Sequence, residues 1–420
     1  MSACPTGIAQ KAFCALFVAI LFFTPFSIAA IEITFPLLLA AWWLGGRKTP
    51  AATFPAERKS LWALLFYIAV CGLSISRSKF PTISWTGFIG KTMEYGLLFL
   101  LASHAVKYAP VPSRAVRAIL IAAWLVLLYS FWQEWAIFRA TYKSTVLDPI
   151  RGFTLGYVRM VGPYKNPNDL ATYLMVVGLL VIALLMEEGR RLPVPLGVLA
   201  LLLVGCLIWT VSRGAILGFW IGTLLLGALH AHRRKGWMAL AGILTASIGF
   251  LLFLSRSNWT TLITLSDIGS QDRSVMWNTG WAMFRDRPFL GHGINTFMAN
   301  YSTYVGGNHW PAYAHNCYLQ IAAETGVAGL AVFLSFLFFL GSICRRALRR
   351  EEASLPPQLR ELRPILTGLA AGVLAFLVQS AFDTNLYAVR QAVLFWTLAG
   401  MVLGISGLLL KPEQTSQPHP

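Results

Sequence analysis

The chain has 420 residues, of which 56% are hydrophobic and 12% charged, and its formal net charge at pH 7 is +17. This composition excludes an ordinary soluble protein and is typical of one that crosses a membrane many times. The six cysteines are scattered and form no CxxC pair, so they indicate neither a metal site nor a disulfide framework.

Apolar segments recur along the whole chain, each close to the length that crosses about 30 Å of hydrocarbon as a helix. We expect about twelve transmembrane helices, at about 12–30, 32–45, 60–76, 84–104, 114–137, 168–186, 193–211, 214–231, 236–254, 325–344, 364–383 and 388–410. The first could be mistaken for a secretory signal, because Lys11 precedes it and Ser27-Ile28-Ala29-Ala30 resembles a cleavage site. No soluble domain follows, so we interpret it as a first transmembrane helix. The predicted fold class is an all-α polytopic membrane protein.

Lysine and arginine gather on one side of these spans, for example in His230–Lys235 and Arg345–Arg350. Because short cytoplasmic loops are rich in such residues, we expect both termini to be cytoplasmic. Residues 1–254 should then carry helices 1–9, with an outer segment near 138–167. A large outer loop at 255–324 should separate them from helices 10–12 at 325–410, and 411–420 should form a cytoplasmic tail.

The outer side also carries more cations than acids, which the topology rule does not explain. A net positive outer face suits an anionic ligand such as a lipid-linked phosphate or diphosphate. Topology and anionic lipid headgroups account for most of the remaining charge, so we expect membrane lipids and no nucleic acid as partners. Inside the fourth span, Lys91 and Glu94 have the spacing of a local ion pair.

The two longer outer segments contain turn signals. In the first, Gly162–Asp169 is rich in glycine, proline and asparagine and ends at a plausible helix start, so it is a candidate lid or rim. In the second, Val275–Phe284 has helical periodicity, followed by a turn at Asp286–Pro288 and a kink at Gly291–Gly293. Its many aromatic residues are expected to anchor at lipid headgroups, with stacking on sugar faces as the alternative.

Two outer arginines have unusual positions. Arg213 lies in a turn between two apolar runs that is too short to need a solubilising charge. Arg273 opens the periodic segment, where a cation opposes the helix dipole, and a bound anion would resolve that mismatch. The alternative for such arginines is contact with headgroups.

Three of the seven histidines, His292, His309 and His315, share the second outer segment, but without the spacing of a metal site. His315 directly precedes Asn316–Glu324, which we expect to be a short amphipathic helix lying on the membrane. A neutral imidazole at that boundary can accept a proton from a hydroxyl group. The alternative is a helix-capping histidine.

Several of these motifs together resemble a known family. His315-Asn316, nine residues, Gly326, two residues and Gly329 resemble the H[NSQ]x9GxxG signature of the O-antigen ligase and polymerase superfamily, in which the histidine is essential. Ser212-Arg213-Gly214 and Arg273 before Trp277 look like its two arginine positions. Gly162–Asn168 and Pro288–Gly293 are similar to its accessory patterns. The resemblance covers about residues 150–345 in motifs and the whole chain in topology.

This resemblance implies a GT-C type, metal-independent, inverting glycosyltransferase in the bacterial inner membrane. Such an enzyme takes glycan from undecaprenyl diphosphate on the periplasmic face, and a ligase delivers it to lipid A-core oligosaccharide, which completes lipopolysaccharide. His315 would then abstract the acceptor proton, while Arg213 and Arg273 hold the diphosphate. Weaker candidates for the phosphate-binding rim are Lys79, Arg159 and Lys165. No metal or other cofactor is expected.

Other functions remain open. A repeat-unit polymerase or a protein oligosaccharyltransferase of the same superfamily would share the donor site and differ in the acceptor; the moderate outer loop favours a ligase. A transporter of lipid-linked glycan would need charges at mid-membrane depth, and only Lys91 and Glu94 resemble these. Across the last outer turn, Asp383 and Arg390 are expected to form a structural pair.

Overall fold

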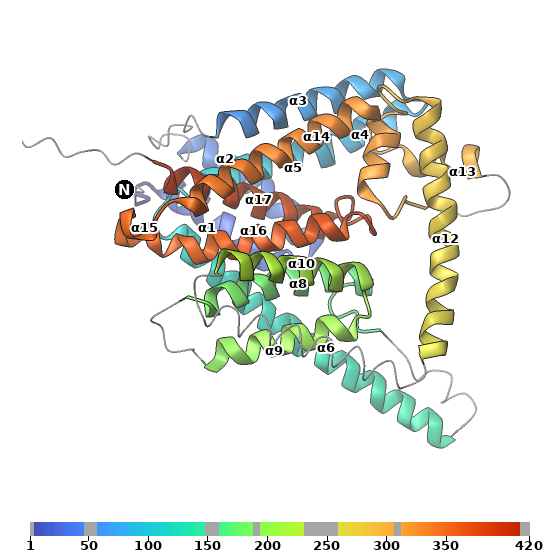
Figure 1. Ribbon diagram of the computed structural model, residues 1–420, viewed down its shortest axis with the longest axis horizontal. Helices are drawn as coiled ribbons and strands as arrows, with labels where there is room; N and C mark the ends of the chain where they lie inside the picture. Colours follow the sequence, from blue (N-terminus) through green and yellow to red (C-terminus); the bar gives the residue numbers. More distant parts are fainter. Residues whose placement is uncertain are drawn as a thin grey trace, which may run out of the picture.

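The computed structural model describes residues 4–45, 57–147, 159–187, 194–230, 259–305 and 312–411. Within these ranges the chain is helical and contains no strand. The helices form a bundle, and one of them, α12, lies across the end of the bundle opposite the N-terminus (Figure 1).

The amino-terminal part follows the predicted order of spans. Its helices are α1 (Ile8–Phe23), α2 (Ile28–Leu44), α3 (Arg58–Ser74), α4 (Pro81–Gly87), the π-helix η3 (Phe88–Met93), α5 (Glu94–Ala105), α6 (Val111–Leu147), α8 (Pro167–Leu185), α9 (Val194–Trp209) and α10 (Arg213–Leu229). The predicted ninth span, 236–254, lies outside the described residues.

The remaining helices form the outer loop and the last spans. They are α12 (Trp259–Asp286), α13 (Phe297–Val305), α14 (Cys317–Arg349), α15 (Pro357–Arg360), α16 (Leu362–Gln379) and α17 (Val389–Leu409). Six helical segments of the described chain are long and apolar enough to cross a membrane, and α1, α2, α9 and α10 are shorter apolar helices. The protein is therefore multi-pass, while the number twelve stays a prediction.

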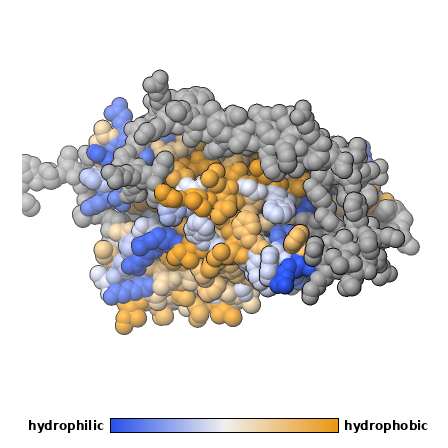
Figure 2. Space-filling model, turned by 90° about the horizontal axis from the view of Figure 1, so that it is seen from below, coloured by the Kyte–Doolittle hydropathy of each residue, from blue (hydrophilic) through white to orange (hydrophobic). Residues whose placement is uncertain are grey.

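Small residues let the central helices pack closely. A Cβ atom at Gly400 or Gly404 of α17 would lie 2.3 and 2.4 Å from the carbonyl oxygens of Phe99 and Ser103 in α5. Such contacts are typical of membrane helices, where packing replaces hydrophobic burial from water. The bundle surface is apolar: Figure 2 shows a broad hydrophobic area with hydrophilic residues gathered toward its two ends.

Three predictions about the outer elements are wrong in detail. First, α6 continues to Leu147, beyond the expected end at 137, and projects past the bundle (Figure 1). Second, α12 begins at Trp259, so Arg273 lies near the middle of a helix and not at its start. Third, the segment after Asn316 does not lie on the membrane surface, because residues 320–326 are all buried within the protein.

The predicted pair between Lys91 and Glu94 is also absent. Lys91 Nζ donates to Asn295 Oδ1 at 2.9 Å, and Glu94 Oε1 is buried without a hydrogen-bond partner in the described part of the chain. The π-helical turn that contains Lys91 directs it toward the outer loop rather than along its own helix.

Candidate active site

The signature histidine pairs with a carboxylate from another element. His315 lies just before α14, with a positive φ of 46° and a partly exposed side chain. Its Nδ1 is 3.3 Å from Asp383 Oδ1, in the turn between α16 and α17. The capping role belongs to Asn316, whose side chain accepts the Leu319 N–H at 3.0 Å. His315 is therefore not the capping residue.

The predicted pair between Asp383 and Arg390 is wrong. Arg390 Nη1 donates to the carbonyl oxygens of Pro25 and Pro163, each at 3.0 Å, and its guanidinium carbon lies 4.2 Å from the centre of the Tyr164 ring. Backbone carbonyls from two loops thus occupy Arg390. This leaves the Asp383 carboxylate to His315.

Asp383 is held in position for that contact. Its Oδ1 also accepts the Thr384 N–H at 2.8 Å, and the residue is buried. A carboxylate beside Nδ1 favours the tautomer in which Nδ1 carries the proton and Nε2 is the basic nitrogen. The pair therefore has the arrangement of a general base and the group that orients it.

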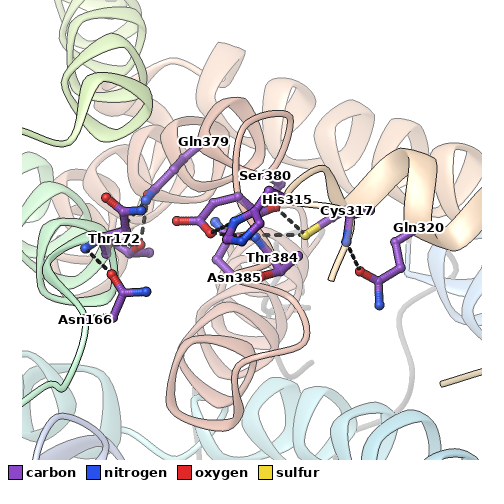
Figure 3. A network of polar contacts seen from close by, with 12 residues as sticks. Asn166, Thr172, His315, Cys317, Gln320, Gln379, Ser380, Thr384 and Asn385 are labelled. Atoms are coloured by element: carbon purple, nitrogen blue, oxygen red, sulfur yellow. Dashed lines mark hydrogen bonds and ion pairs between the residues drawn. The ribbon is translucent and has the colours of Figure 1, made fainter. Parts of the chain in front are cut away.

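Hydrogen bonds join the start of α14 to the turn after α16 (Figure 3). The Cys317 N–H donates to Ser380 O at 2.8 Å, and the Ser380 hydroxyl donates to Asn385 Oδ1 at 2.8 Å. Tyr318 adds a bond from its hydroxyl to Leu377 O at 2.7 Å. Because these bonds fix one backbone segment against the other, they set the separation of His315 from Asp383.

The same network extends to a third helix. Gln379, the last residue of α16, accepts the Thr172 hydroxyl at 2.9 Å and donates to Asn168 O at 3.3 Å (Figure 3). Arg159 Nη2 donates to Asn168 Oδ1 at 2.9 Å, and Arg159 Nε donates to Thr210 O at 2.7 Å. The guanidinium of Arg159 is thus fixed between the first turn of α8 and the end of α9.

Arg213 approaches the turn of Asp383 from α10. It is the first residue of that helix, and its side chain is exposed. The next residue, Gly214, packs against the turn: a Cβ atom there would lie 3.2 Å from Phe382 Cβ. Arg213 therefore stands next to the segment that carries Asp383.

The electrostatics connect these arginines. Burial lowers the pKa of Arg159, the guanidinium groups of Arg273 and Arg213 lower it further, and Asp383 opposes the shift. Arg159 therefore lies within electrostatic reach of two cations from other segments and of the carboxylate that pairs with His315. Arginine stays protonated at neutral pH, so their repulsion persists until an anion binds among them.

Two lysines, Lys79 and Lys165, are predicted to contribute to the phosphate-binding rim. Lys165 is exposed in the turn that precedes the Asn166 cap of α8. Lys79 is exposed between α3 and α4, and its charge acts on Asp286, whose pKa is lowered mainly by a hydrogen bond from Tyr304. Asp286 ends α12, thirteen positions or roughly 20 Å along the helix from Arg273. A role for either lysine in binding phosphate stays a prediction.

Of the other two histidines predicted for this segment, the structure places one away from this site. His292 is fully buried, with Nε2 3.1 Å from Met283 O, and His309 lies outside the described residues. Within the described ranges, no three His, Cys, Asp or Glu side chains gather as metal ligands. The residue that the sequence did not assign to this site is Asp383; its one available signal is a carboxylate in a short outer turn between two apolar spans.

Comparison with known proteins finds a similarity over part of the chain. Residues 198–334 match the family model described as O-antigen ligase. The match runs from α9 into α14 and includes Arg213, Arg273 and His315, while Arg159 and Asp383 fall outside it. No curated protein matches the chain. Over the matched residues the chain is similar to the O-antigen ligase family, whose members are membrane glycosyltransferase-like enzymes.

Proposed function

We propose that the protein is an O-antigen ligase, which transfers glycan from undecaprenyl diphosphate to a sugar hydroxyl of lipid A-core and so completes lipopolysaccharide. The observation that carries the proposal is the His315–Asp383 pair, together with Arg159, whose guanidinium is fixed by hydrogen bonds and lies within electrostatic reach of Asp383, Arg213 and Arg273. A polytopic membrane protein with a cationic, base-containing site at one end of its bundle suits two lipid-linked substrates.

In the proposed reaction the arginines hold the diphosphate of the donor. As the bond between the anomeric carbon and the diphosphate oxygen breaks, that oxygen takes the electron pair and gains negative charge. Fixed guanidinium groups stabilise such a charge best in the transition state, because they are positioned before it develops. Arg159 is held in place by its bonds to Thr210 and Asn168. The step therefore needs no metal ion.

His315 activates the acceptor in this scheme. Its Nε2 takes the proton of the acceptor hydroxyl while the oxygen attacks the anomeric carbon from the face opposite the diphosphate, which inverts the configuration. Asp383 keeps Nδ1 protonated and stabilises the imidazolium that forms. The products are the glycosylated lipid A-core, undecaprenyl diphosphate and one proton, which the histidine later releases.

A purified assay with lipid-linked glycan and lipid A-core in nanodiscs tests this function. His315→Ala should lower transfer by about 100-fold or more, because general-base catalysis contributes that much. Donor affinity should stay within about threefold of the wild-type value, a change that corresponds to a small fraction of the binding free energy. His230→Ala, at the opposite end of α10, is the matched control and should keep full activity. Transfer that survives in His315→Ala would end the general-base proposal.

Deletion of the gene separates the related functions. Loss of all long lipopolysaccharide chains, with normal lipid-linked polymer, is the result expected for a ligase. A band with a single repeat unit would instead identify a polymerase. A wild-type protein that moves lipid-linked glycan across a membrane but transfers none would identify a transporter.

A further inference from the structure

A cavity lined by residues of several helices includes part of the turn that carries Asp383. It lies between α3, the π-helical turn η3, α14 and α17, and its polar wall includes Lys91, Tyr95, Asn295 and Tyr387. Tyr387 follows Asp383 in the same turn, and its ring centre is 6.1 Å from that of Tyr313, two residues before His315. The cavity wall thus shares the turn that carries Asp383 and contacts the segment just before His315 through Tyr387.

Lys91 brings a positive charge to this cavity. An ammonium group has three N–H donors, and the one hydrogen bond of Lys91 within the described residues runs to Asn295 Oδ1. The rings of Tyr313 and Tyr387 lie 6.0 and 5.8 Å from Nζ. The π-helical turn that positions Lys91 is a rare element, which recurs at functional sites.

The nearby carboxylate does not use these donors. Glu324 is fully buried, and its two oxygens accept hydrogen bonds from Asn295 N, Phe297 N, Gln320 Nε2 and Tyr387 Oη at 2.9 to 3.2 Å. Asn295 stands between the two charges, with its backbone bonded to Glu324 and its side chain to Lys91. Two ammonium donors therefore remain available to a ligand.

The cavity contains a second hydrogen-bond donor, the hydroxyl of Tyr95. Tyr95 is only 4% exposed, and its hydroxyl has no hydrogen-bond partner among the described residues. A buried hydroxyl without a partner is unfavourable, and a bound acceptor atom would remove that cost. The rest of the wall, including Leu64, Phe333 and Trp396, is apolar. The cavity thus offers a cation and a hydroxyl donor, enclosed by buried apolar side chains.

We propose that this cavity binds a phosphate group of the acceptor glycolipid, through Lys91 and Tyr95. The assignment to the acceptor rests on the proposed function, in which the arginines take the donor diphosphate. One base would then receive a lipid substrate from each of two anion sites.

Equilibrium binding of phosphorylated lipid A-core to the full-length protein in nanodiscs, without donor, tests this site. Lys91→Met keeps the length of the side chain and removes its charge, so it should weaken binding about tenfold or more. Tyr95→Phe should weaken binding by a smaller factor. Lys59→Met, an exposed lysine at the other end of α3, is the matched control and should bind as the wild type does.

Acceptor treated with a phosphatase separates phosphate recognition from a structural role. The dephosphorylated acceptor should bind the wild-type protein about as weakly as the intact acceptor binds Lys91→Met. The Lys91→Met substitution should not weaken binding of the dephosphorylated acceptor any further. The proposal would be overturned if Lys91→Met lowered the affinity for the intact and the dephosphorylated acceptor equally, or if it lowered the affinity for the donor instead. Displacement of the lipid by millimolar inorganic phosphate would assign the cavity to free phosphate. A wild type that binds acceptor in this way but transfers no glycan would contradict the proposed ligase alone.

Discussion

At the residue scale, the decisive contact is the one between His315 Nδ1 and Asp383 Oδ1. A histidine alone can exist in two neutral tautomers, and only one of them presents Nε2 as a base. Asp383 selects that tautomer, and its own orientation depends on the Thr384 N–H. The proposed catalysis therefore depends on a turn between α16 and α17 as much as on the signature motif.

Asp383→Asn tests this contact with little change in shape. The amide can donate to Nδ1 and so favour the wrong tautomer, and we expect transfer to fall about 100-fold or more. Donor affinity should change little, as measured by equilibrium binding in nanodiscs. Wild-type transfer rates in Asp383→Asn would remove Asp383 from the mechanism.

Arg273→Lys tests whether the cluster recognises diphosphate by geometry. Lysine keeps the charge but loses the planar fork, so we expect donor affinity to fall about tenfold. Arg285→Lys, in the same helix α12 and exposed, should bind donor as the wild type does. Equal donor affinity in both variants would place Arg273 outside the phosphate site.

Most residues of this site could be chosen from the sequence, but not their contacts. His315, Arg213 and Arg273 stand in short motifs that a sequence displays directly. The pairing of Asp383 depends on whether its turn faces Arg390, 7 positions away, or His315, 68 positions away. That is a matter of three-dimensional packing, since backbone carbonyls of Pro25 and Pro163 occupy Arg390.

At the element scale, the break in α14 connects the outer loop to the last spans. Gly326 has φ 70° and ψ −172°, a conformation essentially restricted to glycine. At this break the Val327 N–H donates to Pro288 O at 2.7 Å and the Gly293 N–H donates to Glu324 O at 2.9 Å. The Pro288–Gly293 segment thus packs directly against the break, which holds His315 at the end of the bundle.

Gly326→Ala should disrupt this connection. A Cβ atom there would lie 2.1 Å from Phe289 O, and the backbone conformation is unfavourable for alanine, so we expect a loss of about 3 kcal/mol or more. Gly341→Ala, in the same helix with open space around it, should change stability by less than about 1 kcal/mol. Thermal unfolding in detergent compares them; equal melting temperatures would contradict the role assigned to Gly326.

His292 should make the outer loop sensitive to acid. Burial lowers its pKa, so the stability that its neutral form contributes is present above the usual pKa of about 6.5 and is lost as the pH falls through the lowered value. Asp286, Tyr304, Arg287 and Lys79 surround it. Between pH 7 and pH 5 the melting temperature should fall by about 2 °C more in the wild type than in His292→Gln. Identical pH profiles would show that His292 does not titrate in this range.

Element boundaries were the least predictable part of the fold. Hydrophobic periodicity finds apolar helices, and the described apolar helices overlap predicted spans without sharing their ends. It does not show that α12 begins 14 residues before Arg273, because that part of the helix is polar. Periodicity also misses the end of α6, because the last ten residues of that helix contain no apolar run.

At the scale of the whole molecule, the site residues gather at one end of the bundle. Arg213 begins α10, Asp383 follows α16 and His315 precedes α14, so three chain reversals meet beneath α12 (Figure 1). The positive-inside pattern of the sequence predicts that this end faces the periplasm. The proposed function requires that orientation, because both lipid-linked substrates are expected on that face.

Labelling of introduced cysteines tests the orientation. In a Cys4→Ser background, which removes the one exposed native thiol among the described residues, Trp281→Cys in α12 should react with an impermeant maleimide in spheroplasts. Ala353→Cys, exposed at the opposite end, should react only after lysis. The reverse pattern would place the site in the cytoplasm.

The most direct test of the central claim is a cryo-EM structure of the protein with lipid-linked glycan bound. Our account predicts that Arg159, Arg213 and Arg273 contact the two phosphates and that His315 Nε2 faces the anomeric carbon across the space for an acceptor hydroxyl. A diphosphate bound in the Lys91 cavity, or at the end of the bundle that carries α15, would contradict it.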